Sequence, residues 1–315
     1  QFQGLDWQPS GNPSMYSWQS SQAWNPVLNT NATLNAGDAY IMVIRGSRAV
    51  DLNLNTSPVD NTRLSSTGTV AQGDVTLSPG ITNDEFALIG NPYHAAVDMF
   101  KVLNPNSGYN NFIYVFDPNL GGTSDTNSSS TNLGGRGGYV TVNVTNNNTS
   151  LQSGITGVTT TEANKFLQPY QAVFVQASSS VSPGNITFKE SFKSVNKPQI
   201  DVFNTNSQSH IFVNLFDEES FNNLSSPDDG LVIYFSSNSS NAVNSNDAIK
   251  LLNSDESIAR IQDDNKISFE NRSLPRNNEV LELFTDQYRK TNYKLEIGVN
   301  EFSNKDVYLY DNYLD

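Results

Sequence analysis

The stretch Tyr-Lys-Leu-Glu-Ile-Gly-Val at residues 293–299 decides the fold class. Its odd-numbered residues are apolar or aromatic, and two charged residues lie between them. Successive side chains of a β-strand point to opposite faces, so this alternation predicts a strand with a buried apolar face and a face in water. The residues that share the apolar face are Tyr293, Leu295, Ile297 and Val299. Residues 306–311 (Asp-Val-Tyr-Leu-Tyr-Asp) alternate in the same way and predict a second strand.

Short runs of this kind recur along the whole chain and are bounded by turn residues. The predicted strands are 40–45, 49–54, 67–77, 86–89, 112–116, 139–144, 172–176, 185–192, 211–216, 231–236, 266–270, 280–284, 293–299 and 307–310. Helical patterns are short and occur at 94–103, 161–167 and 247–253. We therefore predict an all-β fold of two consecutive β-sandwich, jelly-roll-like domains with a few short helices.

A change in composition marks the expected domain boundary. Residues 1–195 contain 8 basic and 12 acidic side chains, and residues 196–315 contain 10 and 20. Glycine divides in the same way, because 18 of the 20 glycines precede residue 196. We predict a Gly/Asn/Ser-rich domain at 1–195 and an acidic, glycine-poor domain at 196–315, joined near Ser194–Pro198.

The composition excludes several classes of function. The 315 residues include no cysteine and two histidines, which leaves no thiol nucleophile, disulfide or Cys-based zinc site. The net charge of −14 disfavours binding to nucleic acid or to an anionic membrane surface. No run of about 18 apolar residues predicts a membrane span. No motif of a serine hydrolase, zinc peptidase or phosphate-binding loop is present, so we predict a protein that is not an enzyme.

Paired acidic residues are candidates for a metal site. Asp217 and Glu218 follow one predicted strand, and Asp228 and Asp229 precede the next, so all four flank one loop. Ca²⁺ binds six to eight oxygens, often from loop carboxylates, although the spacing here matches no EF-hand loop. We predict no cofactor and leave structural calcium at these four residues as the alternative.

The three tryptophans all lie within the first 24 residues, and a tyrosine lies between them. Exposed aromatic rings on a β-sandwich can stack against sugar rings, whereas buried rings would fix an N-terminal strand to the core. Both interpretations stay open from the sequence. The candidate ligand-binding residues are Trp7, Tyr16, Trp18 and Trp24.

Several phrases of the sequence occur in an order that resembles a known group of proteins. They comprise Gly37–Gly46 (Gly-Asp-Ala-Tyr-Ile-Met-Val-Ile-Arg-Gly), Leu88–Tyr93 (Leu-Ile-Gly-Asn-Pro-Tyr), Tyr114–Pro118, Gln171–Gln176, Asn246–Asn253 and Val307–Leu314. The chain resembles large cell-surface proteins of Bacteroidota that the type IX secretion system exports, some of them associated with gliding adhesins. Residues 94–96 (His-Ala-Ala) depart from the Pro-Ser-Ala of that pattern, which puts close kinship in doubt.

The resemblance implies where the protein works. It implies an extracellular location at the cell surface or outer membrane, and a sorting domain beyond residue 315. It also implies a role in adhesion, or in a surface adhesin or gliding-motility assembly, with a large adhesin, the secretion machinery or other outer-membrane proteins as partners. The alternative is a carbohydrate-binding module of a secreted polysaccharide-degrading enzyme, with glycans as partners.

Overall fold

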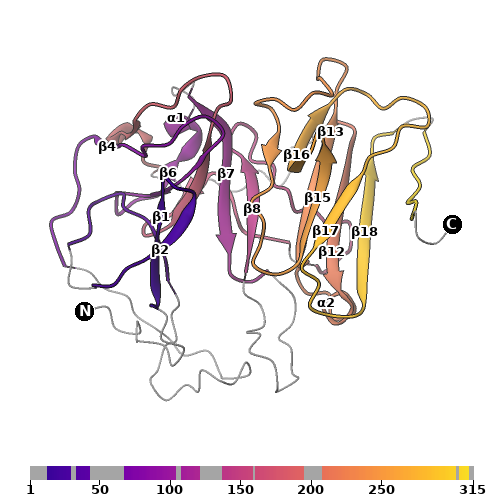
Figure 1. The fold of residues 1–315 in the computed structure, drawn as a ribbon, viewed down its shortest axis with the longest axis horizontal. Coiled ribbons are helices and arrows are strands. Elements are labelled where there is room, and N and C mark those ends of the chain that lie inside the picture. The colour runs from indigo at the N-terminus through magenta and orange to yellow at the C-terminus, as the bar shows by residue number, and fades with distance from the viewer. Residues whose placement is uncertain are drawn as a thin grey trace.

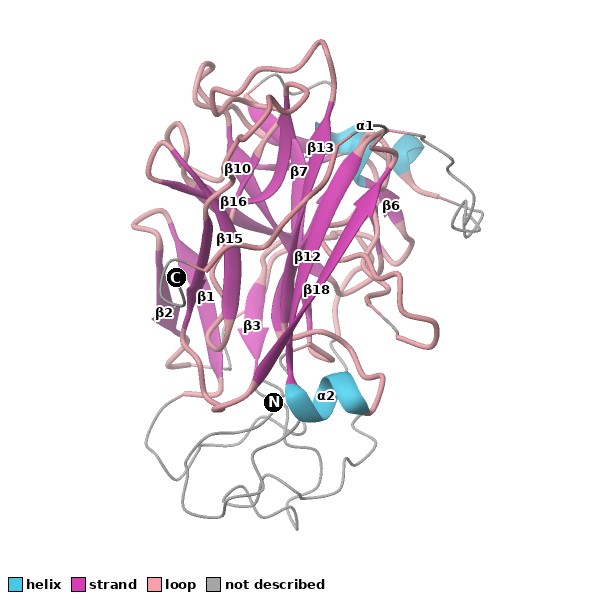
Figure 2. Cartoon of the chain, turned by 90° about the vertical axis from the view of Figure 1, so that its right-hand side faces the viewer, coloured by secondary structure: helices cyan, strands magenta, loops and turns pink. Residues whose placement is uncertain are grey.

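The computed structural model describes residues 13–29, 33–42, 67–103, 108–120, 137–158, 160–194, 208–302 and 305–311. Within these ranges strands dominate and the helices are short, which confirms the predicted all-β fold (Figure 1 and Figure 2). No helix of the described ranges is long and apolar enough to cross a membrane.

The described residues of the N-terminal half form four small sheets. A three-stranded sheet has the order β2-β1-β3, a four-stranded sheet has the order β5-β10-β7-β8, and two further sheets pair β4 with β11 and β6 with β9. The strands are β1 Met15–Gln19, β2 Ala23–Pro26, β3 Tyr40–Met42, β4 Val75–Leu77, β5 Phe86–Gly90, β6 Val97–Asp98, β7 Tyr109–Asp117, β8 Gly138–Asn143, β9 Phe166–Leu167, β10 Ala172–Ala177 and β11 Ile186–Phe188. Helix α1 spans Met99–Leu103, and a 3₁₀ turn spans Glu190–Phe192.

The C-terminal half is built on one seven-stranded sheet. Its order is β17-β15-β16-β13-β12-β18, and β14 pairs with β16 beside this path. The strands are β12 His210–Asp217, β13 Asp229–Phe235, β14 Ala248–Ile249, β15 Ser257–Gln262, β16 Asn265–Arg272, β17 Leu283–Asp286 and β18 Tyr293–Asn300. Helix α2, Glu218–Asn222, follows β12 directly because Asp217 caps it by accepting a hydrogen bond from the backbone N–H of Ser220.

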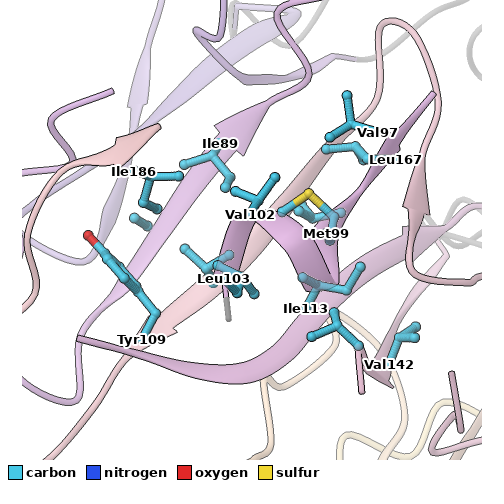
Figure 3. Packing of buried hydrophobic residues seen from close by; sticks show 14 of the residues in the cluster. Ile89, Val97, Met99, Val102, Leu103, Tyr109, Ile113, Val142, Leu167 and Ile186 are labelled. Atoms are coloured by element: carbon cyan, nitrogen blue, oxygen red, sulfur yellow. The ribbon is translucent and has the colours of Figure 1, made fainter. Parts of the chain in front are cut away.

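The four-stranded sheet buries both of its faces. Odd-numbered residues of β7 and β10 face a cluster beneath helix α1, in which Met99, Val102 and Leu103 are buried (Figure 3). Even-numbered residues of the same strands face the opposite side, because side chains alternate along a strand. This double burial explains why β10 reads as a continuous run of apolar residues rather than an alternating one.

An aromatic cluster lies between the four-stranded and the seven-stranded sheets. Its buried members are Phe112, Tyr114, Phe174, Phe212, Val232, Tyr234, Ala248 and Phe269. Hydrogen bonds cross the same contact: the hydroxyls of Thr141 and Ser268 lie 2.7 Å apart, and the Tyr139 N–H donates to Asn253 Oδ1 at 2.8 Å. The two segments that composition separates therefore share a core. The predicted linker at 194–198 lies almost wholly outside the described residues.

The Leu-Ile-Gly-Asn-Pro-Tyr phrase has a structural role at the end of β5. Asn91 Nδ2 donates to the carbonyls of Ala95 and Leu167, and Asn91 Oδ1 accepts from the Tyr93 N–H. The buried Tyr93 hydroxyl donates to the carbonyls of Gly73 and Phe188, at 2.7 and 2.8 Å. These bonds tie together segments far apart in sequence.

Replacement of Gly90 by alanine is expected to lower the free energy of unfolding by about 1–3 kcal/mol, because close packing leaves no room for a methyl group. A Cβ atom at this position would lie 2.8 Å from the Asp38 carbonyl oxygen and 3.2 Å from that of Gly37. Chemical denaturation measures the change. Gly184→Ala is the matched control, since nothing lies within 4 Å of its Cβ position; equal losses in both variants would contradict the packing argument.

The structure differs from the sequence prediction at several elements. The predicted helix at 161–167 contains strand β9, that at 247–253 contains strand β14, and that at 94–103 shortens to α1. No strand forms within the described residues 305–311, whereas β1, β2, β15 and α2 were not predicted. The predicted strand at 49–54 lies outside the described residues.

Neither face of β18 is fully buried, whereas the alternation predicts one buried apolar face. Leu295, Ile297 and Val299 are 36–42% exposed, whereas Glu296 on the other face is partly buried. Glu296 accepts hydrogen bonds from the Ser153 hydroxyl and, at 2.7 Å, from the Gly154 N–H. The apolar row lies beside buried residues of β12, but it is covered less than predicted because β18 is at the edge of the sheet, where its side chains have a neighbouring strand on one side only.

Candidate functional site

Two of the predicted aromatic ligand-binding residues lie in the shared core. The rings of Trp18 and Trp24 face each other across β1 and β2, with centroids 5.1 Å apart, and both pack edge-on against Phe174. Trp18 Nε1 donates to the Phe86 carbonyl at 2.9 Å. The structure therefore supports the core interpretation for these two rings. Tyr16 is partly buried on β1, and Trp7 lies outside the described residues.

A surface groove of about 790 Å³ lies beside this hairpin, between β1, β3 and the segment that joins β4 to β5. Trp18 lines it, which keeps one predicted residue at a possible binding site. The groove is also lined by side chains with amide, hydroxyl and carboxylate groups, among them Asn25, Asn29, Asn35, Asp38 and Tyr40. Small-molecule sites are concave and place a few polar groups among mostly apolar side chains. This groove is more polar than that, which suits a ligand rich in hydroxyl groups.

The polar groups of the groove are held in place by local hydrogen bonds. The Asp38 carboxylate accepts from the backbone N–H and the side-chain amide of Asn35, both at 3.0 Å, and from the Tyr40 hydroxyl at 3.4 Å. Partial burial raises the pKa of Tyr40, and the nearby Asp38 raises it further. The tyrosine hydroxyl therefore stays protonated at neutral pH and can both donate and accept hydrogen bonds.

The four predicted calcium ligands do not form one site. Asp217 caps helix α2 through the N–H and hydroxyl of Ser220, and Glu218 lies at the surface beside Lys294 and Asn292. Asp229 is directed elsewhere, as described next. In the described part of the chain, no three His, Asp or Glu side chains are grouped so that they could hold a metal ion. The alternative of structural calcium at these four residues therefore finds no support, because Asp217 and Asp229 are bonded to other groups and Glu218 lies at the surface.

Asp229 forms a fully buried ion pair. Its Oδ1 lies 2.5 Å from Lys250 Nζ, and its Oδ2 accepts from the Ile258 N–H at 2.7 Å. Lys250 also donates to the Gly230 carbonyl at 3.3 Å. Lys250 comes from the segment after β14, which the sequence analysis predicted to be helical, so this partner was missed.

Asp228 is buried without a hydrogen-bond partner on either carboxyl oxygen. Burial is the largest cause that raises its pKa, followed by the nearby carboxylates of Asp217 and Glu256, and the net value is about 8. The nearby Asp217 backbone and the charge of Arg289 offset this rise only in part. Asp228 therefore carries a proton at neutral pH.

Glu256 and Arg289 lie next to this aspartate and were not predicted. Arg289 Nε donates to Glu256 at 2.9 Å, and the Tyr293 hydroxyl donates to the same carboxylate at 2.6 Å. Hydrogen bonding to Glu256 and, above all, desolvation raise the pKa of Tyr293. A second buried network joins Arg260, Glu270, Arg272 and Glu279. Charged residues are ordinarily predicted to lie at the surface, so nothing in the sequence indicated these buried pairs.

The two histidines occupy separate places. His94 is exposed, and its Nδ1 lies 3.2 Å from the Tyr170 hydroxyl. His210 begins β12, where its ring lies over that of Tyr234 and its Nε2 is 3.1 Å from Asn300 Nδ2. Neither lies with a second histidine, so they supply no paired imidazole chemistry.

The fold and the groove define an all-β protein of packed sheets with a polar concave surface at one end. The chain belongs to the family described as "Domain of unknown function (DUF8693)", whose model matches residues 2–315 and so spans both halves. No curated protein and no solved structure matches the chain.

Proposed function

We propose that this protein is a non-enzymatic, exported cell-surface protein that acts in adhesion by holding a polysaccharide chain in the groove beside β1 and β3. The observation that carries the proposal is the groove itself, which Trp18 and several side chains with amide and hydroxyl groups line. Sugars present hydroxyl groups to such amides and apolar ring faces to aromatic rings. Export, surface location and partners among outer-membrane proteins find support in the order of the phrases from Gly37 to Leu314.

Removal of the Tyr40 side chain is expected to weaken polysaccharide binding by at least about tenfold, which corresponds to about 1.4 kcal/mol. Its ring and hydroxyl line the groove, and its hydroxyl contacts Asp38. Titration of Tyr40→Ala with neutral and acidic polysaccharides, followed by tryptophan fluorescence, measures the loss, because Trp18 borders the same space. Tyr308→Ala is the matched control, since this tyrosine is 82% exposed and outside the groove.

A titration with no fluorescence or calorimetric response to any polysaccharide would contradict the glycan ligand. Measurable hydrolysis of a polysaccharide or peptide would contradict the non-enzymatic role. A carbohydrate-binding module of a polysaccharide-degrading enzyme is the second candidate, and the same groove supports it. Purification of the native protein in mild detergent separates the two, because an adhesin is expected to copurify with outer-membrane proteins and a module with catalytic activity.

A further inference from the structure

Strand β18 forms a long free edge of the seven-stranded sheet. It pairs with β12 over eight residues, from Asp217↔Tyr293 to His210↔Asn300, and no described strand pairs with its other side. β17, at the opposite edge of the sheet, spans only four residues. Natural proteins usually protect such edges with proline, bulges or inward charges, because unpaired backbone groups recruit another strand. β18 contains no proline, and no bulge interrupts its register with β12. Its one inward charge, Glu296, is satisfied within the chain by hydrogen bonds from Ser153 and Gly154.

The apolar row of β18 continues a buried row. Val299, Ile297 and Leu295 lie beside Ile211, Val213 and Leu215 of β12 in the sheet register. The three β12 residues are buried, whereas the β18 residues are 36–42% exposed. One more strand beyond β18 would extend this row and cover its exposed side.

The outward backbone groups of β18 belong to the same apolar residues. The Phe235 N–H donates to the Ser209 carbonyl at 2.8 Å, so the backbone N–H and C=O groups of odd-numbered residues in β12 point toward β13. The backbone groups of even-numbered residues in β12 therefore point toward β18. Their partners in β18 are also even-numbered. The N–H and C=O groups of Leu295, Ile297 and Val299 therefore point away from the sheet.

These features are self-complementary, and we propose that β18 is the interface of a homodimer in which two copies pair antiparallel about a twofold axis at Ile297. In this register Ile297 faces Ile297 of the second copy, and Leu295 faces Val299 in both directions. Each of the three facing pairs exchanges two hydrogen bonds. The two seven-stranded sheets become one continuous sheet, and the interface is isologous, as closed dimers require.

The charges of β18 fit this register. Lys294 faces Asn300 of the other copy, and Glu296 faces Gly298, so no side chain meets one of like charge directly across the interface. Glu296 is already held by Ser153 and Gly154 on the inner face. A second copy is thus favoured over a strand of unrelated sequence, because the apolar residues Leu295 and Val299 lie symmetrically about Ile297.

The absence of cysteine from the chain permits a sharp test. In a hydrogen-bonded antiparallel pair the Cα atoms lie about 5.5 Å apart, which is within the range for a disulfide. Ile297→Cys is therefore expected to form a disulfide-linked dimer quantitatively under mild oxidation. Val280→Cys, at a 76% exposed site away from β18, is the matched control and is expected to cross-link at least about tenfold more slowly by random collision.

Light scattering of the unmodified chain supplies an independent measurement. The chain is expected to show twice the monomer mass at about 100 µM, and Ile297→Lys and Ile297→Glu are each expected to be monomeric. An equimolar mixture of the two variants is expected to regain the dimer mass, since Lys then faces Glu at the axis. A monomeric unmodified chain, a dimer that tolerates Ile297→Lys, or equal cross-linking of both cysteine variants would overturn the proposal.

Discussion

Replacement of Lys250 by methionine is expected to lower the free energy of unfolding by about 3–5 kcal/mol, because it leaves a buried carboxylate without its counter-charge. Lys250 and Asp229 have side chains that are 1% and 2% exposed, and their charged atoms lie 2.5 Å apart. Methionine has a similar length, so the change removes charge rather than volume. Urea denaturation at neutral pH measures the effect.

The double variant Lys250→Met/Asp229→Asn is the control for this prediction. Asparagine keeps an oxygen that can accept from the Ile258 N–H, and no charge remains buried. The double variant is expected to be more stable than Lys250→Met alone by at least about 2 kcal/mol, since replacing both partners of a buried pair costs less than replacing one. A double variant no more stable than the single one would show that the loss comes from packing.

The stability of the protein is expected to fall as pH rises from about 5 to 8, and Asp228→Asn is expected to remove much of that fall. The carboxyl group has a pKa of about 8 in the fold and an ordinary value of 3.8. Between these values the folded protein holds a proton that the unfolded chain releases, so each pH unit costs about 1.4 kcal/mol. Asparagine resembles the protonated carboxyl and does not titrate, so the variant is expected to be more stable at pH 8.

Free energies of unfolding at pH 5, 6, 7 and 8 measure this difference in slope. Burial also raises the pKa of Asp247 and Glu270, so these groups too make the protein less stable as pH rises. Their effect is the same in the unmodified protein and in Asp228→Asn, so it cancels in the difference between the two slopes. Asp263→Asn is the matched control, because this aspartate is exposed in a turn. Parallel curves for the unmodified protein and Asp228→Asn would contradict the assignment of a buried proton to this residue.

Alternation of apolar and polar residues was sufficient to predict the class of the fold. It located β5, β7, β8, β10, β12, β13, β16 and β18, because their side chains contact defined layers on each face. It did not reveal that β18 lies at an edge, where its apolar face is only partly covered, since that depends on the order of strands in the sheet. Strand order depends on contacts between residues far apart in sequence, and a local pattern of apolar and polar residues cannot predict those contacts.

Acidic residues were the least predictable feature of the candidate sites. Asp228 and Asp229 are adjacent in the sequence, yet one forms an ion pair with Lys250 and the other is protonated. Their different states depend on Lys250, Glu256 and Asp217, which the fold brings together from three separate segments. Residues 247–253 were predicted as a helix, and this prediction was wrong. In the structure, Asp247 instead accepts hydrogen bonds from the Asn244 and Asn271 N–H groups, which stabilise a turn.

The aromatic cluster shared by the two large sheets has a consequence for how such a protein can change over generations. Genetic recombination that moved one half alone would leave Phe112, Tyr114 and Phe174 on one side, and Phe212 and Phe269 on the other, without partners in the new host. Either product would expose a wide apolar surface and aggregate. We therefore expect gene duplication and exchange to preserve both halves together, so that any tandem array would repeat at the length of the family match rather than at half that length.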